Sequence, residues 1–169
     1  MIILHKLVPP ENHDLFTRFP KLNHIWEMPA LQQEARESYE GWDKIDYINE
    51  KRGEIFSIDK DGKAIGIIGW FEYGKFPDVL RLRYYGIVPS ERKNKYGAEA
   101  MRLFLEHLSV AAPVQYKWLA ESVTLGREVA PRIITHFKAM GFAEFDDPNY
   151  GSNAGCGPVK SLRIRIPGR

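Results

Sequence analysis

The feature that most constrains the fold is a strand that runs through a basic turn directly into an amphipathic helix. Residues 79–88 alternate apolar and cationic side chains, which is typical of a strand with two different faces, and Pro89 ends the strand. Residues 97–108 then repeat apolar side chains at helical spacing, at Ala98, Met101, Leu105 and Leu108. This order predicts a helix packed across a sheet.

The other predicted elements surround this unit. Further strands are expected at residues 2–8, 54–58, 64–72, 116–123, 142–145 and 159–166. Further helices are expected at residues 11–19, in two pieces over 30–52, and from Pro131 to a cap at Gly141. Residues 59–63 between two of the strands have the composition of a hairpin turn. Together these elements predict one α/β domain over residues 1–169 with a mixed sheet.

Composition excludes several classes of protein. The chain has 169 residues, 44% hydrophobic and 27% charged, and no apolar run reaches the ~20 residues that a membrane-spanning helix needs. The N-terminus reads as a strand and not as a signal peptide, which favours the cytoplasm. Cys156 is the sole cysteine, so an internal disulfide and a multi-cysteine metal site are excluded. A net charge of +2 is too small to indicate nucleic acid by itself.

The basic turn and its flanks carry a recognisable motif. Ile87, Pro89, Arg92 and Gly97 match a pattern of an aliphatic residue, any residue, Pro, two variable residues, Arg or Gln, two variable residues, Gly, one variable residue, then Gly or Ala. The segment resembles the acetyl-CoA motif of the GNAT (Gcn5-related N-acetyltransferase) superfamily. Downstream, residues 137–142 resemble the same family's late aromatic-x-Lys-x-Gly-Phe segment.

The resemblance implies a fold and a cofactor site. The fold is a mixed, mostly antiparallel central sheet with flanking helices, in which the strand at 116–123 splays away from that at 79–88. The cleft between them would hold acetyl-CoA, with its pyrophosphate on the free N–H groups of the helix start. The cofactor-binding residues implied are Ile87, Val88, Arg92, Lys93, Asn94, Lys95, Tyr96, Gly97, Ala98 and Phe137. No metal is expected.

Three positions depart from the family pattern. Lys95 stands at the usual first glycine, where a positive φ would cost a lysine about 1 kcal/mol or more; Asn94 or Gly97 would then take that angle instead. Ala130 replaces a frequent Asn. Phe137 replaces a frequent Tyr that can protonate the departing thiolate, and a phenyl ring has no proton to give.

The catalytic candidates follow from placement beside this cleft. Glu121, on the strand opposite the cofactor turn, is the first choice for the base that deprotonates the amine, with Glu72 as a competitor. Tyr84 or Tyr85 would replace the missing phenol. A backbone N–H at Ile87 or Val88 is the candidate donor to the oxyanion.

The expected function is transfer of an acetyl group from acetyl-CoA to a primary amine of a small molecule or protein. The alternative is a catalytically inactive module of the same fold that regulates or binds other proteins and retains coenzyme A. Nucleic-acid binding through residues such as Arg81 and Arg83 is the weakest reading, because no stacking aromatics interleave the turn. No membrane partner is expected, and the sequence leaves a homodimer open.

Overall fold

The computed structural model describes residues 1–6, 50–73, 77–126, 128–147 and 158–169. The helix expected at residues 11–19 and most of those expected over 30–52 lie outside these ranges. At residues 50–52 the expectation is wrong, because these residues begin a strand in which Glu50 is the partner of Tyr73. Pairing with a neighbouring strand outweighs the helix propensity of this charged segment.

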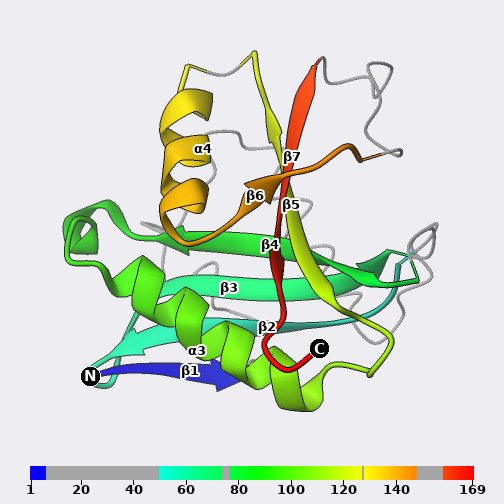
Figure 1. The fold of residues 1–169 in the computed structure, drawn as a ribbon. Helices are drawn as coiled ribbons and strands as arrows, with labels where there is room; N and C mark the ends of the chain where they lie inside the picture. The colour runs from blue at the N-terminus through cyan, green and yellow to red at the C-terminus, as the bar shows by residue number, and fades with distance from the viewer. Residues whose placement is uncertain (7–49, 74–76, 127, 148–157) are drawn as a thin grey trace.

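The described strands form one sheet of seven, in the order β1-β2-β3-β4-β5-β7-β6 (Figure 1). They are β1 (Ile2–Lys6), β2 (Glu50–Lys60), β3 (Lys63–Tyr73), β4 (Val79–Ile87), β5 (Trp118–Thr124), β6 (Ala143–Glu144) and β7 (Val159–Arg165). Within this sheet β4 and β5 run parallel, and the other described pairs are antiparallel. The expected mixed, mostly antiparallel α/β fold is confirmed.

The hairpin between β2 and β3 turns where the sequence predicts it. Asp61 and Gly62 both have positive φ, at 50° and 78°. Two such residues in succession give the turn whose twist matches that of the flanking strands.

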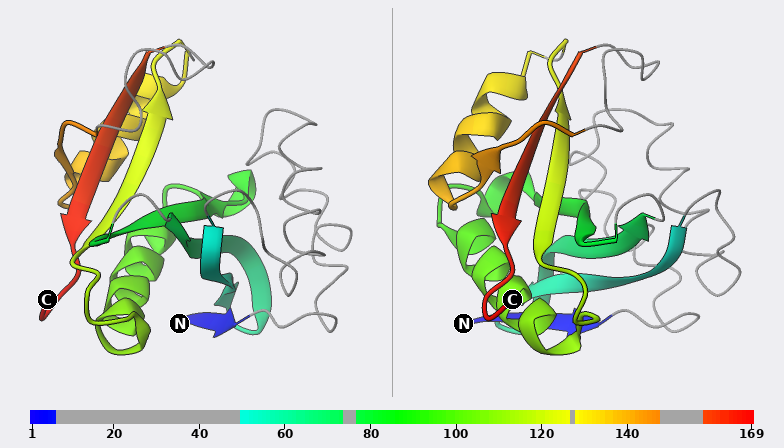
Figure 2. Two further views of the ribbon diagram at one scale, coloured as in Figure 1. Left: turned by 90° about the vertical axis from the view of Figure 1, so that its right-hand side faces the viewer. Right: turned by 45° about the vertical axis from the view of Figure 1, so that its right-hand side comes forward.

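In the described part of the chain two helices flank the sheet, and a short 3-10 turn, η2 (Pro89–Glu91), joins β4 to the first of them (Figure 2). Helix α3 (Tyr96–Ala111) buries Ala100, Met101, Phe104, Leu105 and Leu108 in the core. Ala98, expected on this face, is exposed instead. Helix α4 (Ala130–Ala139) packs beside β5 and buries Ala130 and Phe137. No helix in the described part of the chain is long and apolar enough to cross a membrane.

The parallel strands part soon after they meet. β4 and β5 pair at three positions, Val79 with Trp118, Leu80 with Leu119, and Arg81 with Ala120. β5 pairs with β7 along its whole length, and beyond these three positions β4 continues only beside β3 (Figure 1). The strands therefore form a V whose closed end lies at Arg81 and Ala120.

A bulge interrupts β4 within the open part of the V. Gly69 and Ile67 of β3, two residues apart, face Arg83 and Gly86 of β4, three residues apart. One extra residue thus lies in β4 around Tyr84 and Tyr85, and such a bulge reverses which side chains face each side of the strand.

Candidate active site

The turn between β4 and α3 is held by its own polar contacts. The Arg92 Nε donates to the Ile87 carbonyl oxygen at 2.9 Å, and the Asn94 Nδ2 donates to the Glu91 carbonyl oxygen at 3.4 Å. Lys95 does take the positive φ expected at the family glycine, at 61°, and Lys93 takes a second at 72°. The expectation that Asn94 or Gly97 would adopt this angle instead is wrong.

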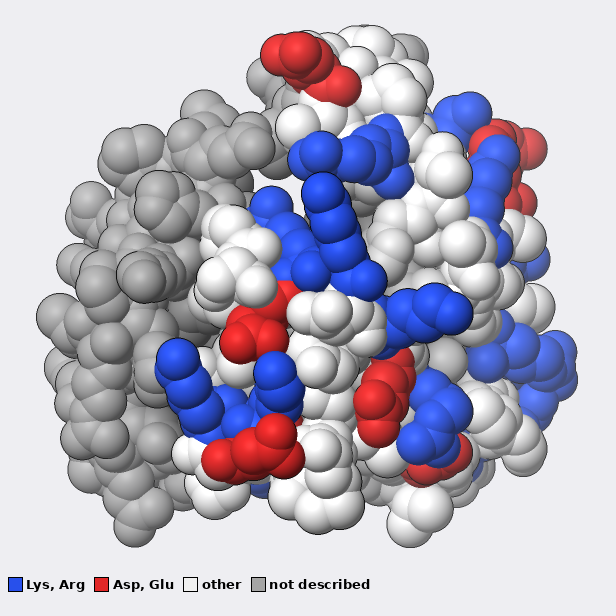
Figure 3. Space-filling view, turned by 90° about the vertical axis from the view of Figure 1, so that its left-hand side faces the viewer, with Lys and Arg blue, Asp and Glu red and all other residues white. Residues whose placement is uncertain are grey.

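This turn presents positive charge at a helix start. Arg92, Lys93 and Lys95 are all exposed, and Figure 3 shows Lys and Arg side chains gathered on the face that carries the turn. Lys95 is the N-cap of α3 and makes no side-chain capping bond. The first N–H groups of a helix lack partners within the helix, so the amides that begin at Tyr96 are available to an anion.

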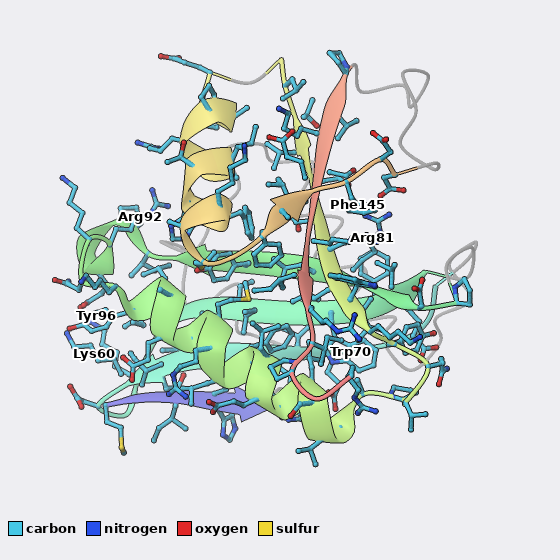
Figure 4. The ribbon with its side chains drawn as sticks, viewed as in Figure 1. Lys60, Trp70, Arg81, Arg92, Tyr96 and Phe145 are labelled. Atoms are coloured by element: carbon cyan, nitrogen blue, oxygen red, sulfur yellow. The ribbon has the colours of Figure 1, made fainter. Side chains whose placement is uncertain are left out.

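The hairpin β2–β3 braces the same turn, a contact that the sequence interpretation missed. The Lys60 Nζ lies 3.0 Å from the Glu91 Oε2 and 4.9 Å from the centre of the Tyr96 ring (Figure 4). Lys60 therefore links the end of β2 to both η2 and the first residue of α3.

Tyr85 lies in the open part of the V and contacts both α3 and α4. Its hydroxyl lies 3.2 Å from the His136 Nε2, and its ring stacks on the imidazole with the centres 6.0 Å apart. A Cβ added to Gly97 would lie 2.7 Å from the Tyr85 hydroxyl oxygen, so only glycine fits there without a shift. Burial raises the pKa of Tyr85 and lowers the pKa of His136. The side chain of Tyr84 lies outside the described residues.

Phe137 completes this group from α4. Its ring is buried, 5.8 Å from the Tyr85 ring and 4.9 Å from that of Phe142. The aromatic position of the late motif therefore adjoins the Tyr85 ring.

Glu121 lies at the closed end of the V. It is the first residue of β5 beyond Ala120, the last partner of β4, and its side chain is half-buried. Burial raises the pKa of Glu121 to about 7, although the Ser122 N–H and the positive charge of Arg81 act in the opposite direction. The competitor Glu72 is buried on β3 opposite Leu80, on the other side of β4 from β5.

The backbone contacts separate the two candidate oxyanion donors. The Val88 N–H donates to the Ile65 carbonyl oxygen at 2.8 Å. The Val88 carbonyl oxygen accepts from the Glu91 N–H at 3.0 Å. This geometry favours Ile87 over Val88 as the donor.

Comparison with known proteins identifies the family. The profile of the acetyltransferase (GNAT) family matches residues 19–119, more than half of the chain. The chain belongs to the GNAT family. Its match spans the turn, the whole of α3 and the first residues of β5.

Solved structures agree with this assignment at the level of the fold. A GNAT-family protein from Desulfovibrio desulfuricans has a TM-score of 0.74 at 11% identity, over 98% of this chain and 99% of that one. Spermidine N-acetyltransferase from Vibrio cholerae, solved with CoA and spermine, has a TM-score of 0.65 at 14% identity, over 98% of this chain and 95% of that one. A ribosomal L7/L12 α-N-protein acetyltransferase in complex with coenzyme A has a TM-score of 0.66 at 10% identity, over 98% of this chain and 94% of that one. A search of curated protein sequences finds no significant match.

The residues present fit coenzyme A. The uncapped start of α3 and the exposed Arg92, Lys93 and Lys95 suit a pyrophosphate, and Gly97 in the first turn of this helix leaves room for the Tyr85 hydroxyl beside it. Among the described residues no group of three or more His, Cys, Asp and Glu is arranged to hold a metal ion.

Proposed function

We propose that this protein is an N-acetyltransferase that moves an acetyl group from acetyl-CoA to a primary amine of a small molecule or protein. We also propose that residues 1–169 act as one acyltransferase domain. The observation that supports this most is the V between β4 and β5, with an anion-binding helix start beside its open end and the Glu121 carboxyl at its closed end. A helix start suits a pyrophosphate, and a carboxylate suits the proton of an ammonium.

The cofactor would be held mainly by backbone. The proposed contacts are Ile87, Val88, Arg92, Lys93, Asn94, Lys95, Tyr96, Gly97, Ala98 and Phe137. Bound acetyl-CoA supplies the acyl group as an activated thioester. The structure favours a role for Val88 through its side chain, because its N–H and carbonyl oxygen are both bonded within the protein.

Glu121 would act as the base. An alkyl amine has a pKa of ~10.4 and is mostly protonated at neutral pH, so it must lose a proton before it can attack a carbonyl carbon. A carboxyl group with a pKa of about 7 is largely ionised at pH 8 and still basic enough to accept this proton. The N–H of Ile87 would stabilise the negative charge that develops on the carbonyl oxygen.

Tyr85 is the proposed proton donor to the leaving thiolate. Phe137 has no titratable group, whereas the Tyr85 hydroxyl lies in the same aromatic group and its raised pKa keeps it protonated at neutral pH. Its contact with the His136 imidazole, on an exposed residue, offers a route for reprotonation from water. Tyr84 is the alternative donor.

The acceptor is proposed only as a class. The similar proteins include enzymes named for spermidine and for a ribosomal protein, so the fold serves both a small amine and a protein amine. A cytoplasmic location and a homodimer stay predictions. Loss of catalysis finds no support in the comparisons, and the assay below tests it directly.

The test is acetyl-CoA binding by calorimetry together with turnover on spermidine and on peptides with a free lysine or free N-terminus. Gly97→Asp should weaken binding at least about tenfold, because its side chain meets the Tyr85 hydroxyl and adds negative charge at the proposed phosphate site. Gly126→Asp is the matched control, since a Cβ there meets nothing within 4 Å. An equal loss of acetyl-CoA affinity in both variants would contradict the proposed pyrophosphate site. Tight binding without turnover on any amine would favour the inactive module.

A further inference from the structure

Lys60 contacts both ends of the turn at residues 92–95, and none of the roles assigned above includes it. Its Nζ lies 3.0 Å from the Oε2 of Glu91, the last residue of η2 and the residue before the turn. The same Nζ lies 4.9 Å from the ring centre of Tyr96, the first residue of α3 and the residue after the turn (Figure 4). One ammonium group therefore contacts the residues on either side of the turn.

The backbone of Lys60 belongs to a rigid element. Lys60 is the last residue of β2, and it pairs with Ile2 of β1 on one side and with Lys63 of β3 on the other. Its side chain is 30% exposed and that of Glu91 is 23% exposed, so their contact is partly shielded from water. A lysine ammonium is charged at neutral pH. Lys60 can therefore hold the turn from a fixed point on the sheet.

The turn needs support from outside because its backbone is strained. Lys93 and Lys95 both have a positive φ, a conformation that costs energy for a residue with a side chain. From within the turn, the Asn94 Nδ2 donates to the Glu91 carbonyl oxygen at 3.4 Å, and this contact is exposed to water. Strained backbone persists only where the surrounding structure holds it. The contacts of Lys60 provide such a hold.

The shape of the turn leaves a run of amides available to a ligand. In the described part of the chain, the N–H groups of residues 93–98 form no backbone hydrogen bond. The first bond of the helix runs from the Glu99 N–H to the Lys95 carbonyl oxygen at 3.1 Å. Successive N–H groups in a turn can form a concave site for an anion. Their directions depend on the φ angles of the turn, so relaxation of the turn would disperse them.

We infer that Lys60 is a positioning residue for the pyrophosphate of acetyl-CoA: by holding Glu91 and Tyr96, it keeps the turn at residues 92–95 in its anion-binding shape. This inference rests on the proposed cofactor site. Two simpler explanations compete with it. In the first, Lys60 only neutralises the Glu91 carboxylate, which would otherwise repel phosphate. In the second, Lys60 leaves Glu91 and contacts a phosphate group itself.

Single substitutions test whether the contacts of Lys60 matter for the cofactor. Lys60→Met keeps an unbranched side chain without the ammonium, and it should weaken acetyl-CoA binding about fivefold or more in calorimetry. Lys60→Arg keeps the charge and can contact both a carboxylate and an aromatic ring, so its affinity should stay within about twofold of the native value. The matched control is Lys63→Met, which removes the same charge from an exposed lysine of the same hairpin and should also stay within about twofold.

A double variant separates position from charge. Lys60→Met/Glu91→Gln has the native net charge and no unpaired carboxylate beside the turn, yet it lacks the hold on the turn. Its affinity for acetyl-CoA should remain about fivefold below the native value. Recovery of the native affinity would show that Lys60 only neutralises Glu91, and would overturn the inference.

A second acyl donor separates this role from general damage to the fold. S-acetylpantetheine carries the same thioester without the phosphates. Its kcat/KM should be unchanged in Lys60→Met, whereas that for acetyl-CoA should fall by about the loss of affinity. An equal fall for both donors would overturn the inference.

The free protein gives the most direct measurement. Nitrogen-15 heteronuclear NOEs of the amides of residues 93–98, recorded without ligand, should fall in Lys60→Met because the turn gains picosecond-to-nanosecond motion. Unchanged values would overturn the inference, since a lysine that acts only by contacting phosphate has no effect before the cofactor binds. This measurement needs neither cofactor nor turnover. If the turn becomes mobile in a protein that binds no acetyl-CoA, Lys60 holds the turn and the proposed function fails.

Discussion

Glu121→Gln should make the protein more stable at alkaline pH. In the folded protein burial raises the pKa of this carboxyl from its ordinary value of 4.5 to about 7. At any pH between these two pKa values, such a carboxyl binds more protons in the folded state than in the unfolded state. Stability is therefore lost as pH rises through this window, and glutamine, which never ionises, escapes the loss.

The magnitude follows from the size of the shift. At 1.36 kcal/mol per pKa unit the ceiling is about 3 kcal/mol, and partial contact of Glu121 with solvent lowers the expectation to about 1–3 kcal/mol. For a chain of this length that corresponds to a rise in Tm of about 2–10 °C at pH 8, with little difference near pH 4.5. Thermal unfolding of both proteins from pH 4.5 to 8 measures it.

A control separates this effect from the loss of any surface carboxylate. Glu144 is exposed, and hydrogen bonds from Lys138 and Lys160 lower its pKa. Its contribution is lost only as pH falls through that lowered pKa, so Glu144→Gln should show no trend between pH 5 and 8. If Glu121→Gln is equally flat over this range, the Glu121 carboxyl is not held in the environment described here.

The same substitution tests catalysis, because a positioned base contributes about 10² to 10⁴ in rate. Glu121→Gln should lower kcat by about that factor and leave acetyl-CoA affinity unchanged. A loss of kcat below about threefold would assign the role of the base to Glu72, Tyr84, Tyr85 or solvent instead. Phe137→Tyr should retain acetyl-CoA binding and raise turnover, because it restores a phenol that can donate a proton. If the activity of the native protein depended on an ionisation assigned to residue 137, the motif would be misaligned. Lys95→Gly should raise the free energy of unfolding by about 0.5–1 kcal/mol by relieving the positive φ, and a lower Tm would contradict this.

The cofactor turn could be predicted because its signals are local. Pro89 ends a strand, Gly97 lies in the first turn of a helix, and the apolar spacing of that helix fits a single packed face. The motif also marked the position of a positive φ, but the expectation that Asn94 or Gly97 would adopt it was wrong, because the turn imposes this angle on Lys95 itself. In each case the residues that determine the structure lie within about one helical turn of one another.

The closed end of the V could not be predicted in the same way. Residues 79–83 alternate apolar and cationic side chains, which favours exposed arginines, yet Arg81 is 3% exposed. Its partner Asp147 lies 66 residues further along the chain, and no spacing in the sequence connects the two. The brace from Lys60 to Glu91 is likewise long-range. Such contacts depend on strand order and register, which become visible only in the folded sheet.

The bulge in β4 shows how one backbone irregularity decides which tyrosine belongs to the site. Leu80 and Leu82 lie in the core with α3, so strict alternation would place Tyr84 on their side and Tyr85 on the side of Arg81. The extra residue reverses this order, and Tyr85 and Ile87 join the core cluster instead. Only because of that reversal does the Tyr85 hydroxyl meet Gly97 and His136. The sequence offers two adjacent tyrosines to the cleft, and the bulge brings Tyr85 to the two helices that flank it.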